Sequence, residues 1–124
     1  MKLNLNYNEV NKRIGKTIAK YRQQSGFTQE QVAEILDIGN EAVSRMERGI
    51  IIPNAVRLIE LAEIFGCTAA DLIGESSPRL FDQTHHIHRM MTDLAESDRN
   101  LMLHFMRCFS IRLKPGNVMS NTEH

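Results

Sequence analysis

Apolar residues recur at helical spacing near the start of the chain, as they do along the buried face of an amphipathic α-helix. Val10, Ile14, Ile18 and Tyr21 follow this spacing, and the intervening positions are largely basic or polar. The pattern predicts a first helix over about residues 8–24, which ends at Ser25-Gly26.

Two short helices are expected next. Thr28 precedes Gln31 by three residues and Phe27 precedes both, which is typical of a capping box with a hydrophobic staple and predicts a helix from Thr28 to about residue 37. After Ile38-Gly39, a third helix is expected over about residues 40–47, with Val43 and Met46 on its apolar face. Two short helices joined by a tight turn make a helix-turn-helix, whose second helix lies in the DNA major groove.

Two more helices complete a compact all-α domain, which we place at residues 8–74. The β-branched run 50–53 predicts an extended connector, and Asn54 caps a fourth helix that Gly66 stops. Thr68 and Asp71 form a second capping box, which starts a short fifth helix ending at residues 72–74.

The C-terminal part has a different composition, beyond a polar linker at residues 75–78. We expect a turn and cap at residues 97–100 between two helices, the second of which is apolar around most of its circumference. Residues 79–114 are therefore predicted to be a two-helix dimerisation hairpin, broken at Pro115-Gly116 and followed by a frayed tail over 115–124. The expected dimer interface comprises Leu80, Ile87, Met91, Leu94, Leu101, Met102, Phe105 and Phe109.

Charge first argues against a nucleic-acid binder. The 124 residues include 15 Lys+Arg and 15 Asp+Glu, for a formal net charge of zero, so bulk positive charge cannot drive DNA binding. Residues 1–74 alone hold nine basic and nine acidic residues. Neutrality then predicts weak non-specific affinity, so that a DNA-binding protein of this kind must depend on dimerisation, helix N-termini and base contacts.

Other chemistry is sparse. Cys67 and Cys108 lie far apart and suit reduced thiols, and no apolar stretch near the start resembles a signal peptide, so we expect a cytoplasmic protein. His85, His86 and His88 are read either as solvated or interface histidines or, alternatively, as part of a metal site. No catalytic constellation stands out, so we expect no enzyme activity and no cofactor.

The segment from Phe27 onward resembles the lambda-repressor/Cro-type helix-turn-helix regulators. The resemblance is ungapped across the motif and covers about residues 10–74. It is carried by Phe27-Thr28-Gln29, Val32-Ala33, Leu36, Ile38, Val43-Ser44, Met46-Glu47, Gly49 and Pro53, then by Leu61-Ala62, Phe65-Gly66 and Asp71-Leu72.

The resemblance implies roles for particular residues. Gln29 matches a glutamine that bonds a phosphate and braces the recognition helix, and Arg22 and Glu47 match an internal ion pair. The third helix would read DNA. Its chemistry suits this role, because Arg45 can form hydrogen bonds with the edge of a guanine, and each good contact between a side chain and a base contributes about 1–3 kcal/mol of discrimination. The implied DNA-binding set is Thr28, Gln29, Gly39, Asn40, Glu41, Ser44, Arg45 and Arg48.

The sequence departs from the family pattern at the turn and at the loop after the third helix. Asp37 stands where glycine is usual, and Gly39 stands where a serine or threonine cap is usual. The loop 50–52 is apolar where relatives often carry basic residues, and Lys12, Arg13, Lys16 and Arg48 are available to compensate.

The sequence therefore predicts a homodimeric, sequence-specific DNA-binding transcriptional regulator, most simply a repressor that occupies a near-palindromic operator. Another hypothesis is an antitoxin-like or coregulator module that binds a protein partner through its C-terminal helices. Whether a small-molecule effector exists is left open.

Overall fold

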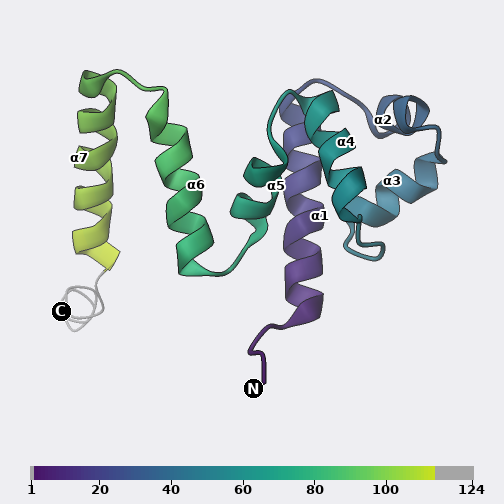
Figure 1. The fold of residues 1–124 in the computed structure, drawn as a ribbon, viewed down its shortest axis with the longest axis horizontal. Helices are drawn as coiled ribbons and strands as arrows, with labels where there is room; N and C mark the ends of the chain where they lie inside the picture. The colour runs from purple at the N-terminus through teal and green to yellow at the C-terminus, as the bar shows by residue number, and fades with distance from the viewer. Residues whose placement is uncertain (1, 114–124) are drawn as a thin grey trace, which may run out of the picture. The chain divides into compact units, whose positions relative to one another are not determined.

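The computed structural model describes residues 2–113, which form helices and connections without a β-strand. The helices are α1 (Tyr7–Gln24), α2 (Gln29–Leu36), α3 (Asn40–Glu47), α4 (Ala55–Phe65), α5 (Ala69–Ser76), α6 (Leu80–Thr92) and α7 (Glu96–Leu113), as Figure 1 shows. The predicted all-α fold is confirmed. No helix among these residues is long and apolar enough to cross a membrane.

The chain divides into two compact units, Met1–His86 and Ile87–His124, with the boundary inside α6. The first holds α1 to α5 and the beginning of α6, and it contains the helix-turn-helix.

The predicted capping residues begin the helices of the first unit. The Thr28 hydroxyl accepts the Gln31 N–H at 3.1 Å, and the Gln31 side chain accepts the Thr28 N–H at 2.9 Å. Thr68 and Asp71 repeat this reciprocal arrangement at the start of α5. These local bonds satisfy N–H groups that the first turn of a helix leaves without partners, so the local sequence defines where α2 and α5 begin.

One core joins the five helices of the first unit. The largest fully buried side chains come one from each helix, and none is more than 2% exposed. They are Ile18, Val32, Val43, Leu61 and Leu72. Because α2 and α3 each contribute a residue to the same core, the two short helices are held by burial rather than by their own length.

α1 and α3 approach closely at Gly15, in the middle of α1. A Cβ atom added to Gly15 would lie 2.4 Å from the Glu47 carbonyl oxygen and 2.6 Å from that of Met46. These distances are shorter than van der Waals contact. The close packing of α1 against the end of α3 therefore requires glycine at this position.

α5 continues past its expected end at residues 72–74 to Ser76, so the first half of the expected linker 75–78 is helical. Ser76 is only 3% exposed, and its hydroxyl donates to the Leu72 carbonyl at 2.6 Å. Arg13 of α1 donates to the Ser76 carbonyl at 2.7 Å and to the Ser77 carbonyl at 3.1 Å. Arg13 thus satisfies carbonyl groups at the end of α5 from another helix. The sequence around α5 does not predict this contact.

The last helix also begins earlier than expected. α7 starts at Glu96, so residues 97–100 form its first turn, and the turn that joins it to α6 lies at residues 93–95 instead. Glu96 and Asp98 place negative charge at the positive end of the helix dipole, which favours this start. The predicted break at Pro115-Gly116 and tail over 115–124 lie outside the described residues.

Apolar side chains of α7 remain uncovered. Every residue from 100 to 113 is exposed, and neither α6 nor α7 has a fully buried residue. Among the predicted interface residues, Leu80, Leu101, Met102, Phe105 and Phe109 are exposed by 41–74%. Ile87, Met91 and Leu94 are half-buried.

Candidate DNA-reading surface

The turn between α2 and α3 is a Schellman motif centred on Asp37. The N–H of Ile38 donates to the Ala33 carbonyl at 3.0 Å, and the N–H of Asp37 donates to the Glu34 carbonyl at 3.2 Å. Asp37 has φ 56° and ψ 47°, the left-handed conformation that glycine adopts most easily and aspartate tolerates better than most residues. The turn thus keeps left-handed geometry without the glycine usual in the family.

Gly39 stands at the N-cap of α3 and provides no side-chain hydrogen bond there. Its extended backbone, with φ −74° and ψ 150°, still directs the chain into the helix. Because no side chain caps this end, the first N–H groups of α3 can donate hydrogen bonds to an external acceptor such as a phosphate oxygen.

α3 presents opposite faces to the core and to solvent. Val43 is fully buried and Met46 is 4% exposed, so this side is fixed. Asn40, Glu41 and Arg45 are exposed, and Ser44 is half-buried at the edge of the outer face. The structure therefore gathers these four predicted site residues on the accessible surface of one helix.

Arg22, Gln29 and Glu47 form a network that ties α1 and α2 to the end of α3. Arg22 donates to both Glu47 carboxylate oxygens, from Nε at 2.6 Å and from Nη2 at 3.1 Å, and from Nη1 to the Phe27 carbonyl at 2.9 Å. Gln29 Nε2 donates to Glu47 Oε1 at 2.9 Å. The Arg22 and Glu47 side chains are 12% and 7% exposed. Gln29 thus braces the end of α3, with its amide N–H directed at Glu47.

Glu41 and two arginines form a second, exposed cluster on α3. Glu41 Oε1 accepts a hydrogen bond from Arg48 Nη2 at 3.0 Å and lies 3.4 Å from Arg45 Nε. All three side chains are more than half exposed. Their carboxylate–guanidinium pairs contribute little to stability and can exchange partners, because water screens them.

Two structural residues at this site escaped the sequence reasoning. Gly15 lies inside the predicted first helix, and a glycine at such a position signals the close approach of another backbone. Arg13 was grouped with basic residues available for phosphate, but its guanidinium is bonded to the carbonyls at the end of α5. No local signal in the sequence identifies that partner.

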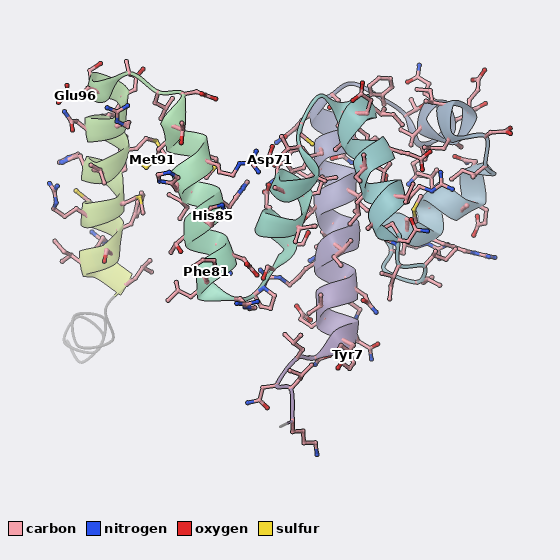
Figure 2. The ribbon with its side chains drawn as sticks, viewed as in Figure 1. Tyr7, Asp71, Phe81, His85, Met91 and Glu96 are labelled. Carbon is pink, nitrogen blue, oxygen red and sulfur yellow. The ribbon has the colours of Figure 1, made fainter. Side chains whose placement is uncertain are left out.

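The histidine cluster is spread over separate environments. His85 stacks on Phe81, with ring centroids 6.2 Å apart (Figure 2). His86 is 11% exposed and packs against Gly74, with Nδ1 3.9 Å from Asp71 and Nε2 3.8 Å from Glu75. A solvated role is therefore wrong for His86, which is a packing residue. Within residues 2–113, no three His, Cys, Asp or Glu side chains are arranged to hold a metal ion.

Cys67 and Tyr21 lie beside Asp71 in the first unit. Burial raises the pKa of the Cys67 thiol, and the negative charge of Asp71 raises it further. The pKa of the Tyr21 hydroxyl is raised by the same two causes in the same order. Both groups are therefore held neutral, and Cys67 behaves as a packing residue rather than as a reactive thiol.

These features define a helix-turn-helix domain, in which a capped α2, a left-handed turn and a braced α3 expose one polar helix face. A helix-turn-helix family model matches residues 18–72, and the chain belongs to this family, the lambda-repressor/Cro-type regulators.

Two relatives are similar to the chain. The HTH-type transcriptional regulator ImmR of Bacillus subtilis is 28% identical over 80 residues, which cover 64% of this chain and 63% of that protein. The uncharacterized HTH-type transcriptional regulator y4dJ of Sinorhizobium fredii is 31% identical over 65 residues, which cover 52% of this chain and 84% of that protein. The chain thus matches somewhat less than two thirds of the length of the Bacillus relative.

Proposed function

We propose that this protein is a sequence-specific DNA-binding transcriptional regulator that reads its site through α3. The observation that carries the proposal is the division of α3 into a buried side and an exposed side. Val43 and Met46 fix the helix, while Asn40 and Arg45 remain accessible with side chains that can pair with base edges. We further propose that the protein is a cytoplasmic homodimer, which would repress transcription most simply by occupying an operator.

The Glu41 cluster supports a specific account of how a neutral domain selects DNA. In the free protein, the Glu41 carboxylate pairs with the guanidinium groups of both Arg45 and Arg48, so the three side chains together carry a single positive charge. On DNA, each arginine must exchange Glu41 for a phosphate or a guanine. A non-specific site offers only phosphates for this exchange, whereas the operator adds base contacts that offset the lost Glu41 pairs, so the domain would bind non-specific DNA weakly and hold its operator through the base contacts.

Dimerisation through α6 and α7 is part of the proposal. A helix that is apolar on most sides is normally buried, and the exposed Phe105 and Phe109 of α7 leave a surface that a second copy would cover. Two copies would place two recognition helices about 34 Å apart, on successive major-groove faces of a near-palindromic site.

Selection of bound sites from a random DNA pool tests the reading helix. We expect a two-fold symmetric site, and Arg45→Ala should lose base preference at one position in each half-site. Arg57→Ala is the matched control, because it removes the same charge from α4, where Arg57 pairs with Glu60. A protein that enriches no sequence, or an Arg45→Ala variant with unchanged base preference, would refute the assignment.

Light scattering of the purified chain tests the dimer. Phe105→Asp should convert the dimer to a monomer and remove most operator affinity, since it places a charge in the proposed interface. A monomeric wild-type protein that still exposes its α7 surface would instead favour the antitoxin-like or coregulator module, in which a different protein covers α7.

A further inference from the structure

A partly enclosed cavity of about 180 Å³ lies in the first unit, apart from the helix-turn-helix. It is formed by the start of α1, by α4, by α5 and by the connection that leads into α6. Its apolar walls are Leu5, Val10, Ile14, Leu58, Ile73 and Pro78. A ligand here would contact the segment that joins the helix-turn-helix domain to the rest of the chain.

The polar groups of the two serines that line this cavity already have partners. Ser76 donates its hydroxyl to the Leu72 carbonyl, and the Ser76 carbonyl accepts from Arg13. The Ser77 hydroxyl donates to Asp82 at 2.6 Å, and the Ser77 carbonyl accepts from Arg13 and from Gln83. The interior therefore offers a ligand apolar contact rather than hydrogen bonds, so the buried part of a ligand must be apolar.

Arg79 supplies positive charge among the described lining residues. Its side chain is 67% exposed, and its Nε lies 3.9 Å from Asp82 Oδ2, a long separation for an ion pair. Asp82 Oδ2 also accepts the Ser77 hydroxyl, so Asp82 keeps a partner if Arg79 turns away. The guanidinium can thus take a ligand carboxylate, which offers shorter, charge-assisted hydrogen bonds.

We propose that this cavity binds a small amphiphilic carboxylate, with its apolar ring or chain inside and its carboxylate on Arg79. An apolar cavity of about 150 Å³ holds benzene, so a chain of about six carbons or a single ring fits this one. Such a ligand would connect α1, α4 and α5 to Ser77, Pro78 and Arg79, and would restrict the connection to α6. An effect on DNA binding rests on the proposed function, whereas binding of the ligand does not.

Titration of the full chain with hexanoate tests the site, with hexan-1-ol and hexylammonium as probes of the same length. Methyl resonances of the first unit should report saturable binding of hexanoate that is stronger than that of either other probe. Arg79→Gln should weaken hexanoate binding about tenfold, towards that of hexan-1-ol, because one charged hydrogen-bonding partner is lost.

Val10→Phe should abolish binding, because the larger side chain fills the cavity. Ile59→Phe makes a comparable change at an exposed position of α4 that does not line the cavity, and it should leave binding intact. If Val10→Phe does not fold, Ile73→Phe fills the cavity from a half-exposed position.

Three outcomes would overturn the site: no saturable binding, hexanoate binding that survives Val10→Phe, or shifts confined to α7. A ligand-free Val10→Phe protein whose dimer dissociates would also overturn it, since a second copy would then cover the cavity. Hexanoate binding that leaves operator affinity unchanged would overturn only the proposed effect of the ligand on DNA binding. A chain that selects no DNA sequence would refute the proposed function, and the hexanoate titration would still decide the ligand site.

Discussion

Replacing Arg22 with methionine should destabilise the first unit by about 3–5 kcal/mol, because it leaves a buried carboxylate without its cationic partner. Glu47 is 7% exposed and receives two hydrogen bonds from Arg22. In the variant, Gln29 would still donate its hydrogen bond to Glu47, but this neutral donor does not compensate the negative charge. Methionine preserves much of the length and packing of the arginine stem, so the loss reports mainly on the charge.

This loss is large compared with the expected stability of the domain. A unit of this size is stable by about 4–13 kcal/mol, from roughly 0.05–0.15 kcal/mol per residue. At about 4–8 °C per kcal/mol, the melting temperature should fall by more than about 12 °C. Arg22→Met should therefore be partly unfolded under conditions in which the wild-type protein is folded.

Urea unfolding followed by circular dichroism measures the effect, at one protein concentration so that dimerisation contributes equally to each variant. The double variant Arg22→Met/Glu47→Met should lose much less stability than the sum of the single variants, since it removes both charges. Arg57→Met is the control at a more accessible ion pair, since the Arg57 and Glu60 side chains are 29% and 47% exposed, and it should cost less than about 1 kcal/mol.

Two results would contradict this reasoning. A loss for Arg22→Met no larger than that for Arg57→Met would mean that solvent reaches Glu47 and that the network contributes little. Additive losses in the double variant would mean that the two side chains do not interact energetically, despite the 2.6 Å separation of their atoms.

Three further predictions concern the contact at Gly15, the turn at Asp37 and the two cysteines. Gly15→Ala should lower the melting temperature, because the added methyl group forces α1 away from the Glu47 carbonyl, and this costs more than the ~1 kcal/mol gained from the higher helix propensity of alanine. An unchanged or higher melting temperature would contradict the close contact. Asp37→Ala should cost about 1 kcal/mol in urea unfolding while Asp37→Gly costs less, since the position is left-handed; equal losses would exclude backbone strain. Iodoacetamide should modify the exposed Cys108 well before Cys67, because the pKa of the Cys67 thiol is raised, and mass spectrometry of partly labelled protein checks the order. The same raised pKa implies that the free energy of unfolding declines as the pH rises above about 8.5, where the thiol of the unfolded chain ionises.

Local sequence predicted the helices of the helix-turn-helix well because local chemistry determines them. Thr28 and Thr68 cap with residues three positions later, and Gly66 ends α4 in a left-handed conformation, so these boundaries follow from short-range hydrogen bonds. The periodic apolar positions predicted the core for the same reason. Ile18, Val43 and Met46 lie where the helical spacing places them, and none is more than 4% exposed.

Contacts between distant residues were harder to predict. The extension of α5 depends on Arg13, which lies 63 residues from Ser76 in sequence, and the packing of His86 against Gly74 joins α6 to α5. The predicted turn and cap at residues 97–100 is instead the first turn of α7, because the acidic Glu96 favours an earlier start. The DNA-reading roles of Asn40 and Arg45 still rest on family resemblance and exposure, because specificity depends on a partner that the sequence does not contain.

The contact at Gly15 has a consequence for how this protein can acquire new targets. α3 is positioned by backbone atoms against α1 and by Glu47 at its end, whereas positions 40, 41, 44 and 45 take no part in that support. If these four positions read bases as we propose, substitutions there would change the recognised bases while the helix keeps its place. Under the proposed function, recognition and scaffold would be physically separate on one helix of 8 residues, and operator preference would be the property of this domain most open to evolutionary change or redesign.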